Sequence, residues 1–236
     1  MIHLHQNVEQ SWPGARFGVL VLRGFAPQPG TGEAFARQAE AELEALRSRH
    51  RDYDRKRFCQ SDGVMAAYTK YYKKFKKSYF VLLQLESILR GKGIPEAPPL
   101  VQALFLTELQ SGMLLAGHDL QGIFPPLSIE CAQGGERCSV AGTGEVSLKA
   151  GDIAMRDERG FFLSMIYGQA ERTRITPGTS DVFFLVDGVP GLDGACYEKT
   201  LERLLSNVRL FQPDAQPERM EILPGLSAAP PLFRRP

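Results

Sequence analysis

Apolar residues in the first half of the chain recur mostly at helical spacing. Between residues 33 and 51 they return every three or four positions, which gives a predicted helix one apolar and one charged face. The same spacing predicts further helices over residues 61–77, 78–90 and 100–115. A short apolar run over residues 16–24 predicts a strand near the start. We therefore expect a helix-rich half over residues 1–116.

After Gly117 the pattern changes to short β-prone runs separated by glycine-rich turns. Two such runs flank the turn residues 157–160, which is typical of a β-hairpin, and the run VFFLV at residues 182–186 predicts a buried strand. A closing helix is predicted over residues 197–208. This pattern makes residues 117–211 the sheet-rich half.

The two halves together predict an α+β fold, in which the helical first half packs on a mainly antiparallel sheet formed by the second half. We expect one domain over residues 1–211. Residues 212–236 are rich in proline and have little periodicity, so they predict a C-terminal tail.

The composition narrows the class of protein. The 236 residues are 43% hydrophobic and 23% charged, with no long apolar stretch and no basic, apolar leader at the N-terminus. We therefore expect a globular cytoplasmic protein without a membrane span. Four scattered cysteines form no CxxC pair, so neither a disulfide framework nor a metal site is expected. The sequence has no phosphate-binding loop, dinucleotide fingerprint or nucleophile elbow, so we expect no cofactor.

Positive charge is concentrated between residues 47 and 77, where eleven Lys and Arg occur with three Asp, although the whole chain has a net charge of only +1. Such asymmetry is typical of a site for a polyanion, and also of a solvated helix face. The candidate RNA-binding residues are the lysines that alternate with aromatic residues in this run: Lys70, Lys73, Lys74, Lys76 and Lys77. In the alternative, which we favour, the aromatic residues on one side of the helix belong to the hydrophobic core: Tyr68, Tyr72, Phe75 and Tyr79.

Candidate site residues gather at two element ends in the second half. His118 follows a buried helix and precedes Asp119; an imidazole there is suited to general-base chemistry, and both residues also suit a packed turn. A second polar group follows the predicted hairpin: Tyr167, Glu171, Arg172, Thr173, Arg174, Thr176 and Thr179. Its arginines and hydroxyls can hold a carboxylate or a phosphate, and an alternating solvated strand would carry the same residues. We predict that the two groups meet around one concave site at the junction of the halves.

Three stretches carry a resemblance to a known family: YYKKFKK with ILRGKGIP, LLAGHDLQGI, and SMIYGQAERTRITPGTSDVFF. In order and spacing they resemble the B3/B4 editing module of the phenylalanyl-tRNA synthetase β subunit, over roughly residues 71–184. Glu171 matches the acid of that module's GGE element. Phe105 and Ala116 stand where the module has an asparagine and a histidine.

The resemblance implies a free-standing B3/B4-like protein related to tRNA. One hypothesis is a trans-acting deacylase that hydrolyses a mischarged aminoacyl-tRNA or another aminoacyl ester, with Glu171 or His118 as the catalytic residue that orients water. The other residues of the two polar groups would then bind the substrate. A second hypothesis is a non-catalytic module that binds tRNA or a free amino acid, and a third is an interaction protein with a vestigial pocket. The absence of the asparagine and the histidine favours the second and third hypotheses.

Overall fold

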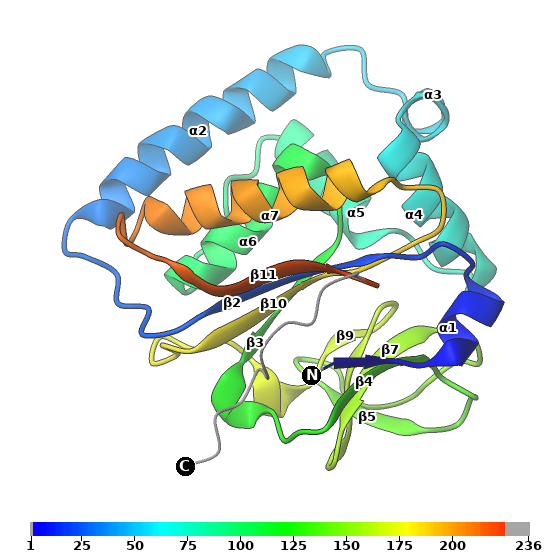
Figure 1. The fold of residues 1–236 in the computed structure, drawn as a ribbon. Coiled ribbons are helices and arrows are strands. Elements are labelled where there is room, and N and C mark those ends of the chain that lie inside the picture. The colour runs from blue at the N-terminus through cyan, green and yellow to red at the C-terminus, as the bar shows by residue number, and fades with distance from the viewer. Residues whose placement is uncertain (1, 225–236) are drawn as a thin grey trace.

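The computed structural model describes residues 2–224, which form an α+β fold (Figure 1). The helices are α1 (Gln6–Ser11), α2 (Thr31–Arg49), α3 (Arg55–Ser61), α4 (Gly63–Lys74), α5 (Phe80–Leu89), α6 (Pro99–Ser111) and α7 (Gly194–Arg209). Two short 3-10 helices, η1 (Leu120–Gly122) and η2 (Glu171–Thr173), follow strands. Local signals set the helix ends: the Asp62 side chain caps the start of α4, and Gly112, with a φ of 71°, ends α6.

The strands form two main sheets and a hairpin. The first sheet has the order β11-β2-β10-β3 and comprises β2 (Phe17–Leu22), β3 (Leu115–Asp119), β10 (Val182–Val186) and β11 (Pro217–Leu223). The second has the order β1-β4-β7-β8-β9 and comprises β1 (Ile2–Leu4), β4 (Leu127–Cys131), β7 (Ile153–Asp157), β8 (Gly160–Ser164) and β9 (Gly168–Gln169). The hairpin pairs β5 (Arg137–Val140) with β6 (Gly144–Ser147). Among the described strand pairs, only β1 with β4 is parallel.

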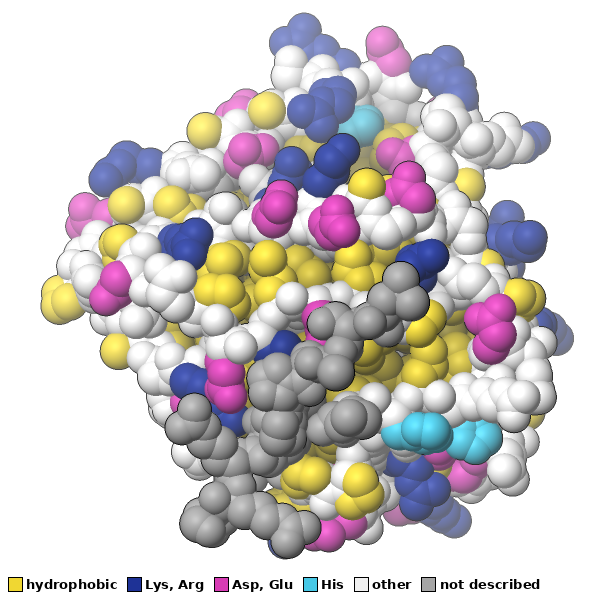
Figure 2. All heavy atoms as spheres, viewed as in Figure 1, with side chains coloured by type: hydrophobic (Ala, Val, Ile, Leu, Met, Phe, Trp, Pro, Cys, Tyr) yellow, Lys and Arg dark blue, Asp and Glu magenta, His cyan; other side chains and the backbone are white. Residues whose placement is uncertain are grey.

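The first sheet lies in the middle of the molecule. Helices α2, α6 and α7 cover one side of it, and the second sheet lies on its other side (Figure 1). Every residue of β2 and β10 is buried, which explains their continuous apolar sequences. Figure 2 shows charged side chains spread over the helical layer and apolar side chains in the band below it. The buried apolar residues of the helices and of both main sheets form one hydrophobic cluster.

Most predicted elements are present, with shifted ends. The VFFLV strand is β10, and the predicted hairpin is β7 with β8. The helix expected over residues 61–77 is α4, which begins at Gly63 after its cap Asp62 and ends at Lys74. The helix expected over residues 100–115 ends at Ser111, before its cap Gly112, and its last expected residue, Leu115, begins β3.

The two chain ends correct the predicted boundaries. At the N-terminus, β1 belongs to the sheet of the second half, so the halves are not separate along the chain. The expected tail over residues 212–236 contains β11, which pairs with β2. The sequence of β11, PERMEIL, has no regular apolar alternation, and its partner is distant in the sequence, so no local signal marks it. The domain thus extends to at least Leu223, and residues 225–236 lie outside the described part.

The favoured interpretation of the aromatic run is confirmed. Four tyrosines and one phenylalanine of residues 68–79 are buried: Tyr68, Tyr71, Tyr72, Phe75 and Tyr79. Their lysine neighbours Lys70 and Lys73 are at or near the surface. The rings are therefore core, and they are not exposed for stacking on bases.

Candidate functional site

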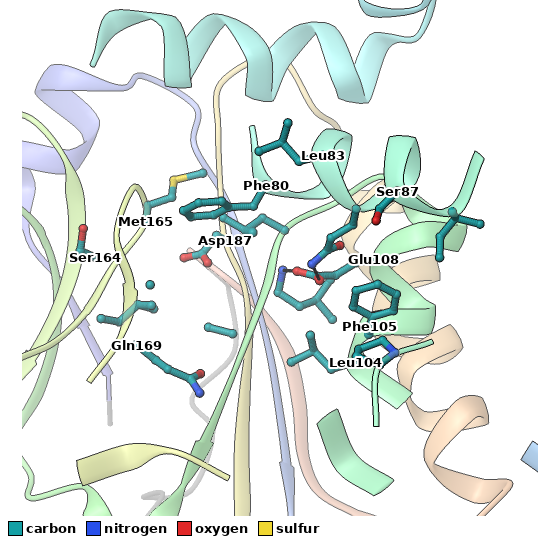
Figure 3. Close-up of a pocket in the computed structure, with 18 of the residues that line it drawn as sticks. Phe80, Leu83, Ser87, Leu104, Phe105, Glu108, Ser164, Met165, Gln169 and Asp187 are labelled. Carbon is teal, nitrogen blue, oxygen red and sulfur yellow. Dashed lines mark hydrogen bonds between the residues drawn. The ribbon is translucent and has the colours of Figure 1, made fainter. Parts of the chain in front are cut away.

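A cavity of about 900 Å³ opens where α5, α6, β3 and the end of β8 meet (Figure 3). Apolar side chains form most of its wall, among them Phe80, Leu83, Leu104, Phe105, Leu115 and Met165. The polar side chains that line it include Gln84, Ser87, Glu108, Ser164, Gln169 and Asp187. An apolar space with a few convergent polar groups is typical of a small-molecule site.

Asp187 lies at the inner side of this cavity, directly after β10. Its amide donates to the Leu114 carbonyl at 2.9 Å, and its carbonyl accepts from the Tyr68 hydroxyl. The next residue is Gly188, at which a Cβ would lie 1.7 Å from the Arg16 carbonyl oxygen. The position therefore requires glycine, and the backbone after Asp187 lies against the backbone of Arg16. Asp187 is 2% exposed, and no described residue donates a hydrogen bond to its carboxylate. Burial raises the pKa of Asp187 well above its usual value, and repulsion from Asp152 and Glu108 adds to the rise.

Glu108 brings a second carboxyl group to the cavity from α6. One oxygen accepts from the Leu115 amide and the other from the Gln84 side chain, both at 2.9 Å. The side chain is buried, and burial raises its pKa to about 7 despite these two hydrogen bonds. Glu108 therefore titrates near neutral pH.

Asp152 supplies a third buried carboxyl group, behind the cavity wall. It accepts hydrogen bonds from Tyr71 at 2.8 Å and from Ser164, and Ser164 lines the cavity. Burial raises the pKa of Asp152 to about 6. The Tyr71 hydroxyl in turn accepts from the Ile153 amide at 2.7 Å, so this carboxyl group is fully engaged, unlike that of Asp187.

The buried tyrosines of α4 and its C-terminal side hold the segments around the cavity. Tyr72 donates to the Met165 carbonyl at 2.5 Å, and Tyr79 donates to the Gly112 carbonyl at 2.7 Å. Tyr68 stacks on Tyr79 with ring centroids 4.7 Å apart. The residues that suggested base stacking therefore fix the loops that carry the candidate site.

The two predicted polar groups do meet. The His118 Nδ1 lies 3.0 Å from the Thr173 hydroxyl, and the Thr179 hydroxyl donates to the Asp119 carboxylate at 2.5 Å. Asp119 also caps η1 by accepting from the Gln121 amide at 2.9 Å. Neither His118 nor any residue of 171–179 lines the cavity described above. Their role in binding stays a prediction.

The surroundings of His118 favour packing over catalysis. The ring is fully buried and lies 5.1 Å, edge to face, from Phe162 and 5.9 Å from Phe183. Burial and, to a smaller extent, the charge of Arg172 lower its pKa to about 3, so the ring is neutral at physiological pH. A general base must reach the proton that it abstracts, and His118 does not line the cavity in which a substrate could lie.

The charged residues of the second group have partners within the protein. Both terminal nitrogens of Arg172 contact the buried Asp157 carboxylate at 2.8 Å, in a bidentate pair. Glu171 pairs with Arg174 at 3.0 Å, with both side chains about half exposed. The Thr176 amide donates to the Thr179 hydroxyl at 3.0 Å. Arg172 therefore has a structural role, whereas Glu171 and Arg174 lie at the surface.

The candidate RNA-binding lysines divide by environment. Lys70, Lys73 and Lys77 line a second cavity, of about 740 Å³, together with Arg55 and Lys56. We call this set the basic groove. Two lysines make cation–π contacts: the Lys74 Nζ lies 4.1 Å from the centroid of the Trp12 ring, and the Lys77 Nζ lies 4.6 Å from that of the Tyr167 ring. Lys76 has a φ of 57° at the turn after α4.

The carboxyl groups of the large cavity were missed by the sequence predictions, although each had a signal. Glu108 is the one acidic residue within the mostly apolar run LFLTEL, and Asp187 directly follows the buried strand VFFLV. Acidic residues are seldom buried without a partner, so an acid inside an apolar run is a reason to suspect a site.

Comparison with known proteins gives a distant similarity in structure. No protein-family model and no curated protein sequence matches the chain. An N-terminal fragment of the phenylalanyl-tRNA synthetase β subunit from Pyrococcus horikoshii is similar in structure, with a TM-score of 0.47 and 10% sequence identity. The similarity covers 94% of this chain and 50% of that fragment, so this chain spans about half the fragment's length. Within residues 2–224, no helix is long and apolar enough to cross a membrane.

Proposed function

We propose that this protein binds an aminoacyl group in the cavity between α5, α6, β3 and β8. The observation that carries the proposal is the cavity itself, which is mostly apolar and has buried carboxyl groups on its inner side. An apolar wall suits the side chain of a hydrophobic amino acid. The polar groups suit the α-amino group and the ester that aminoacyl compounds share.

The resemblance in sequence supports the same location. Phe105 and Ala116, which stand at the positions of the B3/B4 module's asparagine and histidine, both line the cavity. Neither side chain offers a hydrogen bond. Recognition of a polar group would therefore depend on other lining residues, such as Asp187 and Gln169.

Binding without catalysis is the better supported form of this function. The predicted catalytic residues Glu171 and His118 do not line the cavity, and the His118 ring is fully buried. A binding module needs only the shape and polarity that the cavity offers.

Hydrolysis of an aminoacyl ester is a second candidate, favoured by Glu108. A carboxyl group with a pKa near the working pH suits general-base catalysis, and the pKa of Glu108 is about 7. In such a reaction water attacks the ester carbonyl and Glu108 accepts its proton. The proton then passes to the alcohol that leaves when the ester C–O bond breaks.

RNA is the proposed carrier of the aminoacyl group. The basic groove lies along α4, and Lys77 links it to Tyr167, two residues before Gln169 in the cavity wall. Phosphates held along α4 would bring the end of an RNA toward the cavity mouth.

A panel of aminoacyl-tRNAs, aminoacyl esters and free amino acids tests these candidates. We expect at least one of these compounds to bind wild-type protein and not the cavity-filling variant Leu104→Trp. Release of the amino acid by wild type but not by Glu108→Gln would identify hydrolysis, whereas binding without release would identify a binding module. If no compound on the panel binds or is hydrolysed, the proposal is wrong.

A further inference from the structure

We propose that Asp187 binds a primary ammonium group, so that the cavity selects amines over neutral compounds of the same shape. This inference rests on the proposed function of the cavity and names the group that the protein recognises. Figure 3 shows the Asp187 carboxylate pointing into the space that also borders Met165, Gln169 and Glu108.

The first argument is that the Asp187 carboxylate lacks a partner. A buried carboxylate ordinarily accepts several hydrogen bonds or pairs with a cation, because its desolvation is costly. Asp152 follows this rule through Tyr71 and Ser164. Asp187 is as deeply buried, and within residues 2–224 no donor reaches its carboxylate.

The second argument is the sign of the local charge. Glu108 and Asp152 both repel a negative charge on Asp187. Among the described residues that line the cavity, the only basic one is Lys92, which is exposed. A bound cation would relieve the repulsion and allow Asp187 to ionise, whereas a bound anion would add to the repulsion.

The third argument identifies the cation. No group of three or more His, Cys, Asp or Glu in the described part of the chain is placed to hold a metal ion. The wall around Asp187 includes Phe80, Leu115 and Met165, which suit an apolar body better than a hydrated ion. A primary ammonium group attached to an apolar body fits both the carboxylate and the apolar wall. Its N–H groups donate to the Asp187 carboxylate, and its apolar part packs against the wall.

The experiment uses pairs of small ligands that differ only in the amino group. Binding of L-phenylalaninol and L-leucinol to the full chain is measured by isothermal titration calorimetry. Their partners, 3-phenyl-1-propanol and 4-methyl-1-pentanol, have the same carbon skeleton without the amine. We expect the amino alcohols to bind at least about tenfold more tightly than the alcohols, as for a hydrogen bond to a charged group.

Two variants assign the preference to its residue. Asp187→Asn keeps the shape of the side chain and is expected to abolish the preference for amines. Glu96→Gln makes the same change of charge at an exposed residue that does not line the cavity, and it is expected to retain the preference. The melting temperature of each variant checks that it folds. If Asp187→Asn does not fold, the comparison of amino alcohols with alcohols on the wild-type protein still tests the inference.

The outcomes separate this inference from the proposed function. If amines and alcohols bind wild type equally, or if Asp187→Asn keeps the preference, the ammonium site is wrong and the cavity remains a binding site. If neither member of any pair binds while aminoacyl-tRNA does, the ammonium site in this cavity is also wrong. If nothing binds at all, the proposed function fails with it.

Discussion

Glu108, Asp152 and Asp187 are three carboxyl groups whose burial raises their pKa values. An acid with a raised pKa in the folded state is protonated there over a pH range in which the unfolded chain has already lost the proton. In that range the folded state binds more protons, so its stability falls as pH rises. The favourable contribution is present below the ordinary carboxyl pKa and is lost as pH passes the raised value.

Glu108 allows this dependence to be tested at one residue. Its pKa rises from 4.5 to about 7, which corresponds to a loss of about 3 kcal/mol of folding free energy across that range. Glu108→Gln does not ionise and still offers an oxygen to the Leu115 amide. We therefore expect the variant to gain stability relative to wild type between pH 5 and pH 8, measured by urea unfolding at each pH.

The matched control is Glu202→Gln, which changes an exposed glutamate on α7. A difference between Glu108→Gln and wild type that stays constant across the pH range would contradict the raised pKa of Glu108.

At the scale of single residues, the sequence predicted contacts better than it predicted chemistry. His118 and Asp119 contact Thr173 and Thr179, as expected from groups at element ends, but these residues do not line the large cavity. The sequence could not show that the His118 ring is enclosed by Phe162 and Phe183, since that depends on how β3, β8 and β10 pack. The residues next to His118 in the sequence do not indicate whether its ring contacts solvent.

At the scale of elements, α4 presents two different surfaces. Its tyrosines face the core, where they bond to backbone carbonyls beside the large cavity, and Lys70 and Lys73 line the basic groove. The alternation of aromatic and basic residues thus separates into an inner and an outer side of one helix. This arrangement leaves phosphate contacts, without base stacking on these rings, as the predicted mode of RNA binding.

The proposed RNA contact is tested by Lys73→Glu. We expect the substitution to weaken tRNA binding about tenfold at low salt and to reduce the salt dependence of binding, because phosphate contacts release counterions. Lys73 is exposed, so the melting temperature should change little. Gel-shift titrations at several salt concentrations provide the measurement.

Lys199→Glu on α7 is the control, because it makes the same change of charge away from the basic groove. Equal weakening by the two substitutions would mean that net charge, and not the groove, governs binding. An absence of tRNA binding by wild type at low salt would remove RNA from the proposed function.

The sequence predicted the helices and strands that have a strong local pattern of apolar residues, and it missed those, such as β11, that have none. α2, β10 and α7 have clear periodicity or continuous apolar runs. β11 was assigned to the tail because its stability comes from pairing with β2, about two hundred residues away along the chain. Pairing over such a distance has no signature in a local window.

At the scale of the whole molecule, the predicted halves are linked by their ends. The N-terminal strand β1 pairs with β4 in the second sheet, and β11 near the C-terminus pairs with β2 in the first. The sequence predicted an α+β fold correctly, because local patterns distinguish helices from strands. It could not predict how the chain ends cross between the layers, since that follows from packing of the complete core.

Trp12 provides a test of this linkage, because it is the only tryptophan in the chain and contacts both halves. Its indole nitrogen donates to the Gly151 carbonyl at 2.8 Å, and its ring lies 4.5 Å from that of Tyr71 on α4. If the halves unfold as one unit, Trp12 fluorescence and far-ultraviolet circular dichroism should report the same urea midpoint. Trp12→Phe loses the hydrogen bond and should lower stability by about 1–3 kcal/mol. A fluorescence midpoint at a clearly lower urea concentration than the midpoint from circular dichroism would instead mean that the N-terminal segment detaches first. The two layers would then be held together by the remaining core alone.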